Sequence, residues 1–218
     1  MKLISLGNAC KVRESIDRFN GISQETNIFD WVISDFEAVV VIIKSLVNNK
    51  EEELFNQDAF INEGTFVNNQ SHYNLSHKQI NFKSIHDVSV QKQYEDEYKI
   101  FIDKYLRRCI RLRDEISKQS DSIHFIYFIT HKEFIPTIEQ IYYFIINIQI
   151  LRKELPFYIH LLVPPELINY KEIIQKCTIT QHVKVFYMSS FPNIDPVQEQ
   201  RQDLNWYNLY NNIKNNQY

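Results

Sequence analysis

Apolar and polar residues follow two different periods along this chain, and the two periods alternate. Short apolar runs have the length of buried strands and occur at 2–6, 123–129, 157–163 and 183–188. Longer segments repeat apolar residues at helical spacing and occur at 10–19, 93–117, 134–154, 165–176 and 203–214. Strands separated by helices are typical of βαβ units. We therefore expect an α/β fold, with a mainly parallel central sheet flanked by helices.

Breaks in the pattern indicate where some of these elements end. Gly7 interrupts the first apolar run, and Asn20-Gly21 is a strong signal for the end of the helix that follows. Ser34, with Glu37 three residues later, has the spacing of a capping box. We therefore expect Ser34 to cap a second helix that continues through Val47.

The segment 50–90 has the weakest pattern of the chain. It is rich in Asn, Gln, Ser and His, with only short alternating pieces. We expect an irregular insertion containing a hairpin, and long insertions of this kind often form a wall or lid beside a site. No linker or repeat divides the sequence, so residues 1–218 are expected to form a single catalytic domain.

Composition narrows the range of partners. The 218 residues carry a net charge of −3, which gives no basic field for nucleic acid or an anionic membrane. A cluster of arginines at 107–113 is interspersed with acidic residues, and we interpret it as a solvated helix face. The apolar runs are too short for a bilayer span or a signal peptide. The expected location is cytoplasmic, with export lacking a cleaved signal as the alternative.

The three cysteines lie far apart and form no CxxC pair, so we expect neither a disulfide nor a zinc site. Cys10 differs from the other two because it falls between the first strand and the first helix. Ligands of parallel sheets bind at the carboxyl ends of the strands, and a helix N-terminus favours a thiolate. Gly7 permits a tight turn or a close approach to substrate, and Asn8 offers an amide for an oxyanion. Simple packing of a buried cysteine is the alternative.

A thiol nucleophile needs a base, and two histidines are candidates. His131 follows the strand 123–129 and so shares an edge with Cys10, whereas His86 lies in the irregular segment beside Asp87. Asp87 could orient the imidazole or position the loop. Asp30 lies between Phe29 and Trp31, where it could orient a histidine, brace the Cys10 loop or cap a turn. The histidines at 124 and 160 fall inside strands and are expected in the core or on the sheet face.

Four short motifs occur in order: SLGNAC at 5–10, FDW at 29–31, HD at 86–87 and RR at 107–108. Their order resembles the family called putative papain-like cysteine peptidases, of the DUF1796 type. Ile28 stands where that family usually has Pro, and Leu112 where it usually has Phe. The resemblance covers about residues 2–190.

The resemblance implies a thiol enzyme with Cys10 as nucleophile and His86 as base. With it we assign Asn8, Asp30 and Asp87 to catalysis, and we assign four residues to substrate binding: Gly7, Trp31, Arg107 and Arg108. A papain-like fold would place the histidine on an antiparallel sheet, whereas the pattern over 120–190 predicts a parallel one. We take the fold class from the pattern and the catalytic pair from the family.

Three functions fit these observations. The first is a hydrolase of peptide or ester bonds that uses the Cys10–His86 pair and no cofactor or metal. The second is an acyltransferase that moves an acyl group to a glycan with the same pair. Coenzyme A would then need basic groups, and four are available: Lys11, Arg13, Arg107 and Arg108. The third is a non-catalytic binding module. The oligomeric state is left open.

Overall fold

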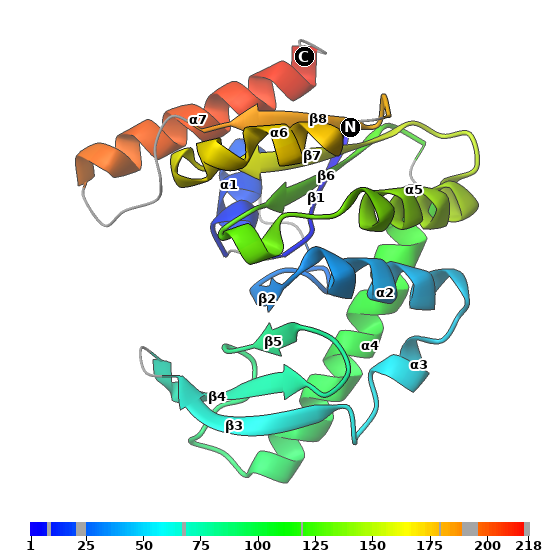
Figure 1. The fold of residues 1–218 in the computed structure, drawn as a ribbon. Helices are drawn as coiled ribbons and strands as arrows, with labels where there is room; N and C mark the ends of the chain where they lie inside the picture. The colour runs from blue at the N-terminus through cyan, green and yellow to red at the C-terminus, as the bar shows by residue number, and fades with distance from the viewer. Residues whose placement is uncertain are drawn as a thin grey trace.

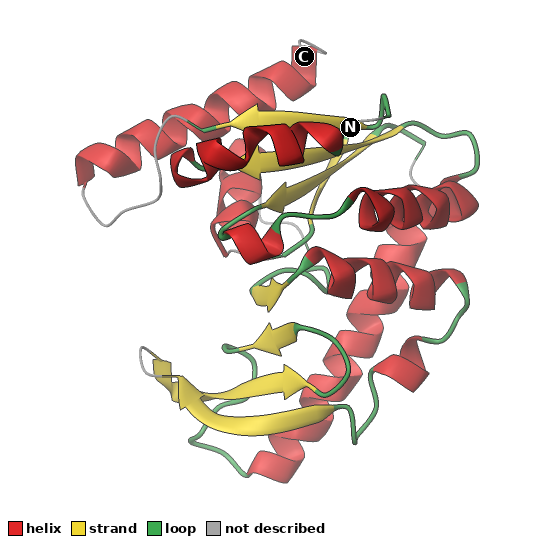
Figure 2. Cartoon of the chain, viewed as in Figure 1, coloured by secondary structure: helices red, strands yellow, loops and turns green. Residues whose placement is uncertain are grey.

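The chain folds around two separate β-sheets (Figures 1 and 2). The computed structural model describes residues 1–7, 10–20, 25–66, 69–118, 120–178, 180–188 and 196–215, excluding the side chains of residues 10, 11, 20, 66, 69, 70 and 196–205. Within these residues, one sheet has four parallel strands and the other has four antiparallel strands. The α/β class with a parallel sheet, expected from the sequence, is confirmed.

The parallel sheet has the strand order β1-β6-β7-β8. These strands are β1 (Lys2–Ser5), β6 (Ile123–Phe128), β7 (Phe157–Val163) and β8 (Val183–Tyr187). Successive side chains point to opposite faces, so Leu3 belongs to one hydrophobic cluster and Ile4 to another. A strand covered on both faces needs apolar residues at nearly every position, which explains the continuous apolar runs in the sequence.

Helices cover both faces of the parallel sheet. The helices α1 (Cys10–Asn20) and α7 (Pro196–Asn215) lie on one face, where Val12 and Trp206 pack with Leu3. On the other face, α2 (Phe36–Val47) and α5 (Ile138–Arg152) pack against each other, and α6 (Lys171–Lys176) lies nearby. Short 3-10 helices follow β6 and β7: η1 (Lys132–Phe134) and η2 (Pro165–Tyr170). None of the described helices is long and apolar enough to cross a membrane.

The antiparallel sheet has the order β2-β5-β4-β3. Its strands are β2 (Val32–Ser34), β5 (Phe82–Ser84), β4 (Asn69–His77) and β3 (Phe60–Phe66), with α3 (Glu51–Leu54) before β3. The long helix α4 (Tyr94–Lys118) runs beside both sheets (Figure 1). Near its start, Phe101 packs on Phe60 with ring centroids 5.0 Å apart, while Leu112 and Ile116 join the core near α5.

The sequence led us to expect an irregular insertion at 50–90, but the structure shows regular elements in this segment. It contains α3 and the strands β3, β4 and β5, and the expected hairpin is the pair β3–β4. The residues 61–65 are all exposed, and the pairing register shifts on either side of Thr65. Exposure on both faces and a broken register remove the regular alternation by which a strand is recognised in a sequence.

The cap of α2 also differs from the sequence prediction. Asp35, and not Ser34, caps the helix by accepting a hydrogen bond from the Ala38 N–H at 2.8 Å. Ser34 is the last residue of β2, and its hydroxyl donates to the carbonyl of Leu6 at 3.3 Å. The capping-box prediction is wrong because the Ser34 hydroxyl bonds instead to Leu6, which is distant in the sequence.

The other elements agree with the sequence prediction except at their ends. The strand β7 has the predicted bounds, whereas α5 begins four residues later than expected, where Thr137 and Gln140 form a capping box. The segment 165–176 divides into η2 and α6, and α7 begins seven residues before the predicted helix.

His124 and His160 lie in the core of the parallel sheet, as expected. They are 2 % and 1 % exposed, and a hydrogen bond of 3.0 Å joins His124 Nδ1 to His160 Nε2. Burial lowers the pKa of His124 to about 4 and that of His160 to about 3, with smaller contributions from neighbouring positive charge. Both imidazoles therefore stay neutral in the folded chain at pH values that would protonate them in the unfolded chain.

This difference predicts a loss of stability in weak acid. As the pH falls below 6.5, each histidine that stays neutral only in the folded state lowers the free energy of unfolding by about 1.4 kcal/mol per pH unit. His160→Gln removes one of these groups, so its stability should fall less steeply than that of the wild type between pH 6 and pH 5. Urea unfolding at pH 7, 6 and 5 measures both slopes, and equal slopes would contradict the prediction.

Candidate functional site

The junction between β1 and α1 rests on a close backbone contact. Gly7 has φ +88°, and a Cβ added to it would lie 2.3 Å from Ser34 Oγ and 3.5 Å from the carbonyl oxygen of Phe29. Only glycine fits there, since any side chain would meet β2 and strain the backbone. The helix α1 then begins at Cys10. The side chain of Cys10 and the whole of Asn8 lie outside the described residues.

A buried turn at residues 27–30 holds Asp30 against α1. Asp30 is 0 % exposed, and its Oδ2 accepts hydrogen bonds from the Asn27 N–H and from Arg13 Nη1, both at 2.7 Å. Burial raises the pKa of this carboxyl to about 6, while the charge of Arg13, the Asn27 N–H and the charge of Arg108 oppose the rise. Asp30 thus caps the turn and also braces the helix that begins with Cys10, two of the roles considered from the sequence.

Trp31 follows this turn in an unusual backbone conformation. Its φ of +67° lies in the left-handed region, which costs a bulky residue about 1–2 kcal/mol. The indole is half-buried, and the next residue, Val32, pairs with Ser84 at the end of β5. Strained positions of this kind persist only where the surrounding structure imposes them.

The HD motif lies just beyond β5. His86 is exposed, and its ring centroid is 6.4 Å from that of His72 on β4. Asp87 is turned into the protein, where its Oδ2 accepts hydrogen bonds of 2.6 Å from Ser84 Oγ and from Tyr105 OH. Its Oδ1 accepts a hydrogen bond from Lys104 Nζ. These contacts favour the loop-positioning role for Asp87.

The charges around Asp87 keep it ionised. Burial by itself would raise the pKa of Asp87, but the positive charges of Lys104 and Arg108, together with the hydrogen bonds, lower it below the ordinary value. Burial and the nearby Asp87 charge raise the pKa of Tyr105 well above the ordinary value, so the phenol remains a hydrogen-bond donor.

We expected the arginines of α4 to form one solvated helix face, but they do not. Arg107 is exposed, but Arg108 is only 7 % exposed, and its Cζ lies 5.1 Å from the centre of the Tyr105 ring. Arg111 Nη1 donates to the carbonyl of Thr26 at 2.7 Å, and Arg113 Nη1 donates to Glu51 Oε1 at 2.8 Å. Their acidic and carbonyl partners come from distant segments, which the sequence of α4 alone does not reveal.

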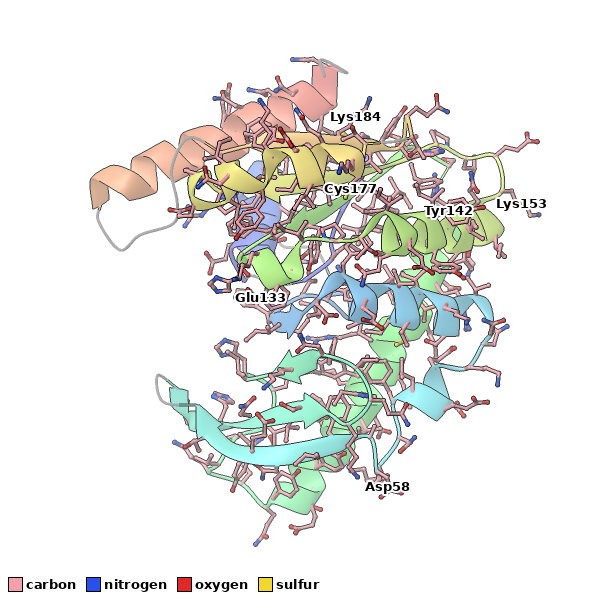
Figure 3. All side chains as sticks on the ribbon, in the orientation of Figure 1. Asp58, Glu133, Tyr142, Lys153, Cys177 and Lys184 are labelled. Atoms are coloured by element: carbon pink, nitrogen blue, oxygen red, sulfur yellow. The ribbon has the colours of Figure 1, made fainter. Side chains whose placement is uncertain are left out.

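His131 occupies a different part of the molecule from the HD motif. It is exposed in the loop after β6 and lines a cavity of about 430 Å³, which is formed by the segments that follow β6 and β7. Glu133, labelled in Figure 3, lies on η1 and lines the same cavity. Because β6 pairs with β1, His131 is at the sheet edge expected from the sequence.

The other two cysteines, Cys109 and Cys177, are buried, and burial raises the pKa of both thiols. Cys109 is 0 % exposed, and burial together with the charge of Glu51 raises the pKa of its thiol far above the ordinary range. Cys177, labelled in Figure 3, donates from Sγ to the Pro136 carbonyl, and burial raises its pKa to about 11. Among the described residues, no group of three His, Cys, Asp or Glu side chains could hold a metal ion.

The candidate residues thus lie on connected segments. Gly7 meets Ser34 of β2, and β2 pairs with β5, which leads directly to His86 and Asp87. Lys104 and Tyr105 also belong to this group, although our sequence analysis gave them no part in the site, and so does Arg13, which it suggested only as a group for coenzyme A. A helical spacing of four and three residues between Lys104 and Tyr105 on one side and Arg108 on the other is the signal that could have placed both beside Arg108.

The sequence matches one known protein family over most of its length. A family model described as putative papain-like cysteine peptidase (DUF1796) matches residues 1–165. The match covers most of the chain, including both sheets apart from β8, and the chain belongs to this family. Searches among curated proteins and among solved structures returned no match.

The close contact at Gly7 predicts a large effect of a single methyl group. Gly7→Ala should lower the free energy of unfolding by about 2–4 kcal/mol, because the left-handed backbone and overpacking against Ser34 both add to the cost. Gly64→Ala is the matched control: it has φ +85° with nothing within 4 Å of the added Cβ, and should cost about 1–2 kcal/mol. Chemical denaturation measures both.

A second variant separates the contact from the backbone strain. Ser34→Ala removes the hydroxyl that the new methyl group would meet and leaves the next atoms at 3.5 Å or more. Gly7→Ala should therefore cost less in the Ser34→Ala background than in the wild type. An equal cost in both backgrounds would show that contact with Ser34 does not constrain this junction.

Proposed function

We propose that this chain is a thiol-dependent hydrolase of peptide or ester bonds, with Cys10 as nucleophile and His86 as base. The observation that carries the proposal is the close contact of Gly7 with β2. This contact joins the start of the Cys10 helix to the sheet whose strand β5 leads to His86. Membership of a cysteine peptidase family supports a hydrolase and favours a peptide substrate.

The proposed reaction is a two-step acyl transfer. His86 accepts the Cys10 proton as Sγ attacks the substrate carbonyl carbon, and the protonated imidazole then gives that proton to the leaving amine or alcohol. Water hydrolyses the resulting thioester, with His86 as its base, and the free acid and the thiol are released. Backbone N–H groups at the beginning of α1, together with the Asn8 amide, bind the oxyanion.

The surroundings of the proposed pair have separate roles. Asp87 is held by Ser84, Tyr105 and Lys104, so it fixes the loop that carries His86 and does not act as a third proton carrier. Asp30 braces α1 through Arg13. The exposed Arg107 and the half-buried Trp31 are the side chains proposed to contact the substrate.

The proposal predicts an unusually reactive thiol. Cys10 should react with iodoacetamide with a titration midpoint below the ordinary thiol value of about 8.5, because a helix N-terminus and a protonated His86 both favour the thiolate. His86→Asn should raise the midpoint toward that value. Mass spectrometry of Cys10 peptides measures the reaction, and Cys109 and Cys177 should stay unmodified because they are buried.

His131→Asn is the matched control, since it removes the other candidate base from a different loop. Its midpoint should equal that of the wild type. A wild-type midpoint at or above 8.5 would contradict the proposed function. A shift caused by His131→Asn and not by His86→Asn would assign the base to His131.

A further inference from the structure

Arg108 forms an ion pair with the buried Asp87, and its charge also acts on a second buried carboxylate, Asp30, in another part of the proposed site. Its Nη1 is 3.9 Å from Asp87 Oδ2, and its charge also lowers the pKa of Asp30. Both carboxylates are almost fully buried, with side chains 8 % and 0 % exposed. Because opposite charges attract strongly where water is excluded, one guanidinium can restrain both segments.

On one side, this charge acts on the loop that carries His86. Asp87 directly follows His86 and is held by Lys104 and Tyr105, which precede Arg108 on α4. The Tyr105 ring lies beneath the Arg108 guanidinium, which adds a cation–π contact. The position of the His86 loop thus depends on one face of α4.

On the other side, the charge acts on the helix that begins with Cys10. Asp30 pairs with Arg13 at 2.7 Å, and Arg13 follows Cys10 by three residues on α1. Arg13 Nε also pairs with Asp17 at 3.0 Å. Positive and negative groups therefore alternate from α1 through Asp30, Arg108 and Asp87 to Lys104.

The hydrogen bonding of Arg108 indicates that its charge matters more than its donors. Its Nη1 is buried and has no hydrogen-bond partner among the described residues. A buried polar atom without a partner is costly and calls for an explanation. An arginine kept for packing alone could be replaced by an apolar residue of similar length without this cost.

We propose that Arg108 is a positioning residue. Its charge, which acts on both Asp30 and Asp87, keeps the His86 loop at a fixed position relative to the Cys10 helix. This inference rests on the proposed function and assigns a buried group of α4 to the same site. Because Arg108 is buried, this role replaces the substrate-binding role that we expected for it from the sequence: Arg108 acts through other residues.

The test compares Arg108→Met with a matched variant on the same helix. Arg108→Met keeps an unbranched apolar side chain in place of the arginine stem and removes the charge. It should raise the midpoint of Cys10 alkylation by about one pH unit, which slows alkylation at pH 6.5 about tenfold because the thiolate fraction falls. Arg108→Lys, which keeps the charge, should recover most of the wild-type midpoint.

Arg113→Met is the control. Arg113 pairs with the buried Glu51 and with Asn49, at the α3 end of the molecule. Its loss should lower the melting temperature and leave the alkylation midpoint of Cys10 unchanged. The control thus separates a loss of stability from a loss of positioning.

The outcomes distinguish this inference from the proposed function. A wild-type midpoint at 8.5 overturns both. A low wild-type midpoint that His86→Asn raises, together with equal midpoints for Arg108→Met and Arg113→Met, overturns only the role of Arg108. If Arg108→Met does not fold, Asp87→Asn removes the opposite charge of the same pair. It should produce the same shift, and an unchanged midpoint would overturn the inference.

Discussion

The close approach of Gly7 to Ser34 is the contact on which the arrangement of the two sheets depends. The parallel sheet ends here at β1, and the antiparallel sheet begins here at β2. The Ser34 hydroxyl donates to the Leu6 carbonyl, so the junction has a hydrogen bond as well as close packing. A side chain at residue 7 would push these strands apart, and with them the segments that carry Cys10 and His86.

The sequence predicted the parallel sheet well because its strands are buried on both faces. Ile123 to Ile129 are all buried, and His124 is the one charged or imidazole side chain in an otherwise apolar and aromatic run. The antiparallel sheet was missed because β3 is exposed through residues 61–65 and its register shifts near Thr65. A period-two pattern needs one buried face, so a strand that is exposed on both faces and has a shifted register leaves only a weak pattern.

The candidate site, like the fold, was predicted only in part from the sequence. Cys10 and His86 were identified by short motifs and by the position of Cys10 after the first strand, which are local features of the sequence. The ion pair of Arg13 with Asp30 and the contact of Arg108 with Asp87 join residues that are 17 and 21 positions apart. Charged residues on a helix usually face water, so the pattern gave no reason to bury Arg108. Only the tertiary structure brings its partners to it.

The two expectations about the fold that conflicted in the sequence are both consistent with the structure. Local patterns predicted a parallel sheet, and the family resemblance implied a histidine borne by an antiparallel sheet. The chain has both sheets, with α1 following a parallel strand and His86 following an antiparallel one. A boundary between two sheets made only of apolar contacts could slide, because such contacts have little directional preference. The hydrogen bonds of Asp30 with Arg13 and of Asp87 with Ser84 and Tyr105 are directional, so they restrain α1 and the His86 loop in a way that apolar packing does not.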